Sequence, residues 1–304
     1  MCFLLKSFAP DAVVAERMLA SFRKNNTEDI HLYAVVPAQD FDAFGSFRGA
    51  DVTLIAEEEF GRHLTDRPVS GIRPGYINQE IIKLAFHELS VADSYFTVDS
   101  EAEFLRSFSR QDFLHPDGSP YSVLVEDCDL AVDPDYYRDY WRSRSEALRV
   151  IWQEVGVDDP VIRTCHGHQV LNSKVLTSFT QEFLKPRGWT YIDALEISPY
   201  EYTWYNAWLL KSRVIPIHPR EPFVKVFHTE KDYLQAILAG IHAEDLARGY
   251  LAVVINGSFS QHIDSPSAAA SKPEVIARTL SYEELAAVLR EKIRVSTARR
   301  WRGK

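Results

Sequence analysis

The most constraining feature of this sequence is the segment 95–104, in which an aromatic and β-branched run ends abruptly in acidic residues. Residues 95–98 read Tyr-Phe-Thr-Val, a composition typical of a buried strand. Asp99, Ser100 and Glu101 follow at once. Ligands of open α/β sheets bind beyond the carboxyl ends of the strands, and paired carboxylates suit a hard divalent cation that also binds phosphate oxygens. The segment therefore predicts a metal–diphosphate site at a strand end, with Asp99 and Glu101 as metal ligands.

The first hundred residues alternate between predicted strands and predicted helices. Apolar runs at 2–5, 30–36 and 51–55 predict strands, while 10–24 and 75–89 predict helices with one apolar face. This alternation is typical of a parallel sheet covered by helices, with right-handed crossovers. The expected fold class is α/β.

The composition argues against several classes of protein. The chain has 304 residues and a net charge of −9, whereas nucleic-acid-binding proteins are more often basic, so no nucleic-acid partner is expected. Its three cysteines show no CxxC spacing, which favours a reducing compartment over a disulfide framework. The N-terminal apolar run is too short for a signal peptide, and no run is long enough to span a membrane. A cytoplasmic protein is expected.

The last forty residues differ in character from the rest of the chain. Residues 1–264 are expected to form one domain, and 265–304 a small-residue linker, a C-terminal helix and a basic tail. A frayed, solvated end is one interpretation of this tail, and peripheral contact with a lipid surface is the other. Its basic residues are Arg294, Arg299, Arg300, Arg302 and Lys304.

Four segments carry a resemblance to a known family. Asp99-Ser100-Glu101 resembles the Asp-X-Asp motif of nucleotide-sugar-dependent glycosyltransferases, in a variant that ends in Glu. Residues 75–84 (Gly-Tyr-Ile-Asn-Gln-Glu-Ile-Ile-Lys-Leu) and 94–101 together resemble an uncharacterised group of nucleotide-diphospho-sugar transferase-like proteins with the GT-A fold, and residues 4–11 are similar to that group's opening segment. Residues 199–206 (Pro-Tyr-Glu-Tyr-Thr-Trp-Tyr-Asn) are similar to its Ser-Glu-Tyr-x-x-Tyr-Gly segment, with Tyr200 in place of Ser and Asn206 in place of Gly.

The resemblance, which covers residues 1–230 in order, implies both a fold and an activity. The fold is GT-A-like (nucleotide-diphospho-sugar transferase), with a mixed, mostly parallel central sheet flanked by helices. The activity is metal-dependent transfer of a sugar from a nucleoside-diphospho-sugar, in this family often a UDP-sugar, to a hydroxyl of a carbohydrate or another acceptor. The implied cofactor is Mn2+ or Mg2+, which neutralises the charge of the departing diphosphate.

Several residues are candidates to bind the donor. Lys83, on the helix before the acidic motif, is placed to reach a donor phosphate or the motif's carboxylates, and Gln79 lies one turn before it. Arg73 offers a bidentate donor to a phosphate. For each of these residues, a solvated surface position is the alternative.

The end of the first strand supplies a second group of candidates. Lys6 and Ser7 follow that strand, where such folds receive the nucleotide, and Ser100 lies inside the acidic motif. Asp11 is a candidate contact for the base or ribose; alternatively, it only starts the following helix.

Glu201 is the candidate catalytic base, and Asp99 is the second candidate catalytic residue. Desolvation among aromatic side chains is expected to raise the pKa of Glu201, which would suit a base that takes the acceptor proton in an inverting reaction. The alternative is a core helix whose Glu faces water. The surrounding aromatic residues are Tyr200, Tyr202, Trp204 and Tyr205. Of these, Tyr202 and Tyr205 are candidate sugar contacts.

Histidines provide the remaining candidates. His166, Gly167 and His168 have the wrong spacing for a helical metal pair, so His166 is expected to contact substrate, with a plain turn as the alternative. GT-A enzymes often take a third metal ligand from a C-terminal histidine. His228 is the preferred candidate for this ligand, and His262 competes with it.

Two other functions stay open. A metal-dependent nucleotidyltransferase normally has a Gly-rich loop after its first strand, which residues 6–10 lack. A non-catalytic protein that binds carbohydrate or nucleotide on a degenerate transferase fold is the other alternative. A glycoside hydrolase would need a pair of carboxylates for which the sequence has no comparable match.

Overall fold

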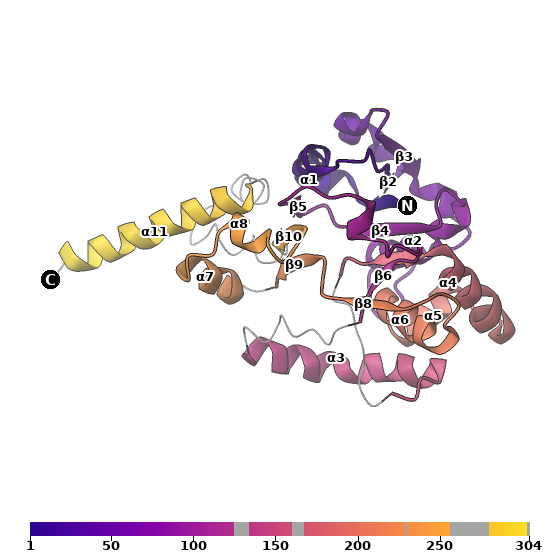
Figure 1. Cartoon of the computed structure of the whole chain (residues 1–304). Helices are drawn as coiled ribbons and strands as arrows, with labels where there is room; N and C mark the ends of the chain where they lie inside the picture. Colours follow the sequence, from indigo (N-terminus) through magenta and orange to yellow (C-terminus); the bar gives the residue numbers. More distant parts are fainter. Residues whose placement is uncertain (125–133, 160–166, 229, 256–279, 303–304) are drawn as a thin grey trace. The chain divides into compact units, whose positions relative to one another are not determined.

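The computed structural model of the chain describes residues 1–124, 134–159, 167–228, 230–255 and 280–302 (Figure 1). It divides into two units: residues 1–12, 26–100 and 108–222 form the first, and residues 13–25, 101–107 and 223–304 form the second. The domain boundary expected near residue 264 lies outside the described residues and stays a prediction.

The first unit is built on a five-stranded sheet with the order β3-β2-β1-β4-β7. Four of the strands are parallel, and β7 runs antiparallel to β4, which confirms the prediction of a mixed, mostly parallel sheet. The carboxyl ends of β1 and β4 therefore share one edge, and the residues just before β7 reach that same edge. The strands are β1 (Cys2–Lys6), β2 (Leu32–Val36), β3 (Val52–Ala56), β4 (Ser94–Val98) and β7 (Val170–Asn172).

Helix α2 (Pro74–Ala85) leads into β4 and forms as predicted. Pro74 suits its first turn, and Ile77, Ile81 and Leu84 recur at the spacing of one buried helical face. Helix α2 packs against α5 (Tyr191–Ile197) and α6 (Glu201–Ser212).

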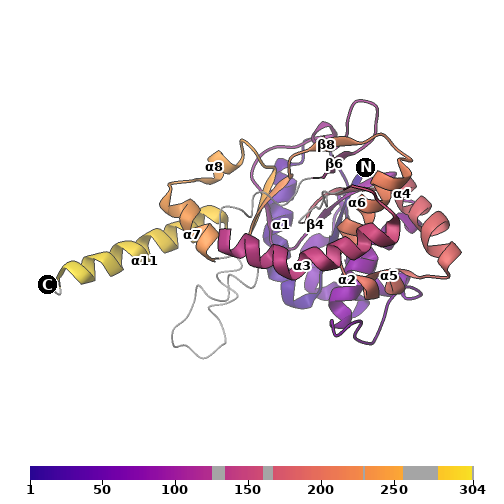
Figure 2. The same ribbon diagram turned by 90° about the horizontal axis from the view of Figure 1, so that it is seen from below.

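Two further helices, a separate pair of strands and several short helical turns complete the first unit. Helix α3 (Pro134–Val155) packs along α6, as the two views show (Figure 1, Figure 2). Helix α4 (Ser173–Ser178) starts behind Asn172, whose side chain accepts a hydrogen bond from the Lys174 amide. Strands β6 (Tyr121–Val123) and β8 (His218–Arg220) form a separate parallel pair. The short helical turns are η1 (Ala9–Asp11), η2 (Ala38–Phe47), η3 (Glu57–Phe60), η4 (Phe86–Leu89), η5 (Arg110–Asp112), η7 (Phe179–Leu184) and η8 (Lys185–Arg187).

The second unit has a three-stranded sheet with the order β5-β10-β9. The rings of Phe227, Tyr233 and Tyr282 pack in its core. Its strands are β5 (Ala102–Phe104), β9 (Val224–Phe227) and β10 (Ala252–Ile255), and its helices are α1 (Ala12–Asn25), α7 (Glu230–Leu238), α8 (Ala243–Leu246) and α11 (Tyr282–Arg302). Helix α11 is the predicted C-terminal helix, and it includes most of the segment that was expected to be a basic tail. None of the described helices is both long and apolar enough to cross a bilayer.

Candidate active site

Polar side chains meet where β1 and β4 end. The hydroxyl oxygens of Ser7 and Ser100 lie 2.9 Å apart, and both residues are buried. Lys6 donates to the Ser7 carbonyl at 2.8 Å and forms an ion pair with Glu57 at 2.8 Å. The structure thus brings together three of the predicted donor residues, but it also shows that the Lys6 charge has a protein partner.

A buried charge cluster links α2 to α6. The Lys83 ammonium nitrogen lies 2.8 Å from Glu201 Oε1 and 3.4 Å from Glu80 Oε2. The three side chains are 9%, 7% and 3% exposed. The two alternatives in which Lys83 is solvated and Glu201 faces water are therefore wrong, because each charge is held inside the protein by the other. In this interior each partner depends on the other for its stability.

The charges in this cluster perturb one another strongly. Burial raises the pKa of Glu80 well above its usual value, and the Glu201 carboxyl adds to the increase. Burial alone would lower the pKa of Lys83, but the carboxyl groups of Glu201 and Glu80 hold it well above its usual value. Proton loss from Glu80 and from Lys83 is therefore shifted toward higher pH for both groups.

Asp99 lies beside His168 at the end of β4. Asp99 Oδ2 is 3.3 Å from His168 Nε2, and the Asp99 amide donates to the same nitrogen at 3.3 Å. Burial acts to raise the pKa of Asp99, but His168 and Lys83 bring it below its usual value. Burial lowers the pKa of His168, although Asp99 acts in the opposite direction. At neutral pH the structure thus holds an ionised Asp99, 38% exposed in its side chain, beside a neutral imidazole.

The backbone explains how His168 reaches this position. Because β7 is antiparallel to β4, with Phe96 opposite Val170, the residues before β7 lie level with the residues that end β4. His168 adopts a φ of 49°, in the left-handed region that non-glycine residues rarely occupy. Such strain persists where surrounding contacts fix a side chain, and here it places the imidazole against Asp99.

The two tyrosines predicted to contact a sugar are buried. The Tyr202 hydroxyl lies 2.7 Å from Thr97 Oγ1, and the Lys83 ammonium lies 5.0 Å from the centre of the Tyr202 ring. The Tyr205 hydroxyl accepts a hydrogen bond from the Asn172 amide at 3.1 Å. These contacts tie α6 to β4 and β7, and a contact of either ring with sugar stays a prediction.

The other predicted residues are more scattered. In the first unit, Arg73 is exposed at the start of α2, while Gln79 and Asp11 are half-buried. Asp99 belongs to the first unit but Glu101 and His228 belong to the second, where both are half-buried. The ligand set of Asp99, Glu101 and His228 stays a prediction. The positions of His166 and His262 lie outside the described residues.

Two residues that the sequence analysis did not select lie close to the site. Glu80 completes the buried cluster, and its position between Ile77 and Leu84 on the apolar face of α2 was a signal that a charge is buried there. Gln169 is fully buried, and neither polar atom of its side chain has a hydrogen-bond partner among the described residues. Its carbonyl accepts from the Thr97 amide at 3.2 Å, next to Asp99. Burying an amide without hydrogen-bond partners costs free energy. The Gln169 side chain is therefore a candidate position for a ligand atom that would pair with it.

A cavity of about 510 Å³ lies elsewhere in the first unit. Its lining includes Cys2, His31 and Asp93, which stand at the amino ends of β1, β2 and β4. It therefore opens at the edge of the sheet opposite to Asp99, and it is not part of the candidate site.

The architecture matches that of solved glycosyltransferase structures. A crystal structure of the galactosyltransferase LgtC, in complex with donor and acceptor sugar analogs, aligns over 95% of this chain and 96% of its own, with a TM-score of 0.50 and 14% identity. A glutamine-to-glutamate active-site mutant of LgtC aligns over the same shares, with a TM-score of 0.51 and 13% identity. No protein-family model and no curated protein sequence matches the chain. The chain therefore has the GT-A-like fold.

Proposed function

We propose that the protein is a metal-dependent glycosyltransferase that moves a sugar from a nucleoside-diphospho-sugar to an acceptor hydroxyl. The observation that carries this proposal is the ionised, partly exposed Asp99 at the carboxyl end of β4 in a GT-A-like sheet. Beside it lies a buried cluster of strongly perturbed ionisable groups, which is typical of functional sites. The LgtC structure with donor and acceptor sugar analogs supports the reaction class.

Asp99 is the proposed anchor of the metal and, through it, of the donor. Its carboxylate would bind Mn2+ or Mg2+, with Glu101 as the second ligand expected from the sequence. The metal would neutralise the diphosphate as it leaves. Ser7 and Ser100, whose hydroxyls meet at 2.9 Å, offer donors for the nucleotide where β1 and β4 end. A UDP-sugar is the first donor to test.

We propose that Gln169 contacts a substrate. Its buried amide presents a donor and an acceptor that the described residues leave unpaired. A sugar hydroxyl supplies the matching acceptor and donor. The mutated active-site residue of the LgtC mutant is also a glutamine, which supports the choice of residue type.

Glu201 has two possible roles in this proposal, as the base or as the holder of Lys83. Its 2.8 Å contact with the Lys83 ammonium favours the second role, because the carboxylate is already paired with a buried cation of the protein. A kinetic comparison separates the roles. Loss of a base in Glu201→Gln would lower kcat by about 100-fold or more and remove the acidic limb of the pH profile, where protonation of the base stops the reaction. Loss of positioning alone would lower kcat without changing the shape of that profile.

The second candidate function is a non-catalytic binding protein. The same Lys83–Glu201 contact favours it, because the carboxylate proposed as the base is paired with the Lys83 ammonium rather than turned to an acceptor. A thermal-shift screen of nucleoside diphosphates and diphospho-sugars, with and without Mn2+, identifies the donor through its stabilising effect. Release of nucleoside diphosphate from that donor is then followed over time. Release that requires Mn2+ supports the enzyme, binding without release supports the alternative, and the absence of both contradicts the two proposals.

A further inference from the structure

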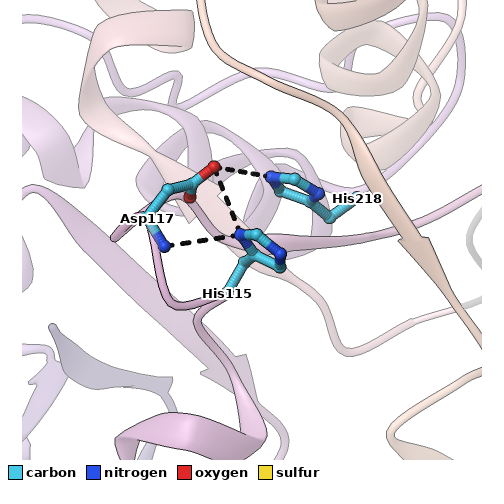
Figure 3. A group of neighbouring side chains, drawn as sticks. All are labelled: His115, Asp117 and His218. Carbon is cyan, nitrogen blue, oxygen red and sulfur yellow. Dashed lines mark hydrogen bonds and ion pairs between the residues drawn. The ribbon is translucent and has the colours of Figure 1, made fainter.

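A second group of ionisable side chains lies in the first unit, outside the candidate active site (Figure 3). His115 and Asp117 come from the turn before β6, and His218 is the first residue of β8. Strands β6 and β8 pair in parallel with Tyr121 opposite His218, so the fold brings two distant segments together. The side chains of His115, Asp117 and His218 are 36%, 41% and 25% exposed, so the group remains open to solvent.

The Asp117 carboxylate is held in place by its own turn. Its Oδ1 accepts hydrogen bonds from the Ser119 amide, at 2.9 Å, and from the Ser119 hydroxyl. These bonds hold the pKa of Asp117 well below its usual value. The turn is closed by the Gly118 amide, which donates to the His115 carbonyl at 2.8 Å, and by the His115 amide, which donates to Ser119 at 2.9 Å. The anchored carboxylate therefore presents its other oxygen in a fixed direction.

Both imidazoles face that second oxygen. Asp117 Oδ2 lies 2.9 Å from His218 Nε2 and 3.2 Å from His115 Nδ1, as the dashed lines in Figure 3 show. The Asp117 amide also approaches His115 Nδ1, at 3.4 Å. In a neutral imidazole Nδ1 carries either a lone pair or a proton, so it either accepts from that amide or donates to Asp117 Oδ2. A metal ion bound between Nδ1 and Oδ2 would use that lone pair in place of the proton.

We infer that His115, Asp117 and His218 form a binding site for a transition-metal ion of the Zn²⁺ class. Imidazole nitrogens with one carboxylate oxygen are typical Zn²⁺ ligands, and three protein ligands leave one position for water. Bonds of about 2.0–2.2 Å in a tetrahedron place neighbouring ligand atoms roughly 3.3 Å apart. The observed contacts of 2.9 and 3.2 Å are already near that value, and all the ligand atoms lie within 4.8 Å of one another.

Metal binding requires a small rearrangement of the rings. The two imidazoles stack with centres 3.6 Å apart and planes inclined by 14°. Nearly parallel rings cannot both hold one ion in their planes, so one ring has to rotate about χ2. The energy wells of this torsion are broad for histidine. The Ser119 contacts keep the carboxylate still meanwhile, as outer partners do for metal ligands.

The test is calorimetric titration of the chelator-treated full chain with Zn²⁺. It is performed in an Asp99→Ala background, so that the ion has no ligand at that position of the proposed donor site. We expect one Zn²⁺ per chain, with an affinity that falls by about 100-fold or more in His218→Gln and in Asp117→Asn, since loss of an outer partner alone costs 10–100-fold. Binding of Co²⁺ in place of Zn²⁺ gives an absorption readout of the coordination that does not depend on activity.

A matched control lies in the second unit. His242 Nδ1 lies 3.4 Å from Glu283, so it is a surface imidazole with a carboxylate neighbour, and among the described residues it belongs to no cluster with a second histidine. His242→Gln should leave the affinity unchanged. Equal affinity in His218→Gln, or no binding stronger than that of isolated surface histidines, overturns the inference. Neither result bears on the donor site at Asp99, because the two sites share no residues.

Discussion

Two clusters of ionisable groups in the first unit differ in their access to water. The cluster of Glu80, Lys83 and Glu201 is almost fully buried, whereas His115, Asp117 and His218 lie at the surface. In the interior, attraction between charges is strong but each group would be costly without its partner. At the surface the attraction is weaker, and water can replace any partner that is lost.

The difference suggests a division of roles. The buried cluster is complete by itself, since the protein supplies both the ammonium and the carboxyls, and it is suited to hold α2 and α6 in one arrangement next to Asp99. The exposed cluster keeps a carboxylate fixed between two imidazoles that stay open to solvent, and it is suited to exchange a proton or a metal ion. Removing single groups from each cluster tests this division.

The largest effect is expected from Lys83→Met. It leaves two carboxyl groups buried without their cation, and the free energy of unfolding should fall by about 3–5 kcal/mol. Urea unfolding measures this loss. Lys211→Met is the matched control, because the Lys211 ammonium donates to the Gly156 carbonyl from an exposed position, and its loss should change little. Equal stability of the two variants would contradict the view that the buried cluster holds the fold together.

A smaller effect is expected from the interior histidine His87. His87 is buried, with Nε2 3.2 Å from the Tyr191 hydroxyl, and burial lowers its pKa to about 4. Its folded pKa is depressed below the unfolded value of about 6.5, so the unfolded chain binds the proton first as pH falls. As the pH falls from 6.5 to 4, this histidine should therefore lower the free energy of unfolding by about 3 kcal/mol.

His87→Gln tests this pH dependence. Unfolding free energies measured from pH 7 to pH 4 should fall less steeply in the variant than in the native chain. A variant slope identical to that of the native chain would mean that folding does not lower the pKa of His87.

The smallest effect is expected from Asp117→Asn in metal-free protein. The carboxylate is exposed and water can replace it, so the melting temperature should stay within error of the native value. Excess Zn²⁺ should then raise the melting temperature of the native chain but not that of the variant, by linkage. A large loss of stability without metal would show that Asp117 serves the β6–β8 pair rather than an ion.

The sequence predicted the central sheet because its strands and α2 are long and strongly patterned. The run that ends at Val98 is aromatic and β-branched, and the apolar positions of α2 repeat at helical spacing. Strand β7 was not predicted, because Val170–Asn172 is too short to show a pattern. Consequently His168 and Gln169 were not expected beside Asp99, a position that follows from the antiparallel pairing of β7 with β4.

The candidate site was predictable only where local pattern placed a residue. Asp99 and Lys83 follow from a strand end and from a helix leading to it, but the pairing of Lys83 with Glu201 depends on how α2 packs against α6. Glu80 was not among the predicted residues, whereas its neighbour Gln79, in the segment 75–84 that resembles the family, was. The approach of His115 to His218 depends on the pairing of β6 with β8, which no sequence spacing encodes.

The most direct test of the proposed function is a titration of the protein with a nucleoside diphosphate in the presence of Mn2+, by calorimetry. It compares the native chain with Asp99→Ala and with Asp93→Ala, which removes an exposed aspartate just before the opposite end of β4. We expect Mn2+-dependent binding in the native chain and in Asp93→Ala, and a loss of that binding in Asp99→Ala. Unchanged affinity in Asp99→Ala would contradict a metal–diphosphate site at this strand end.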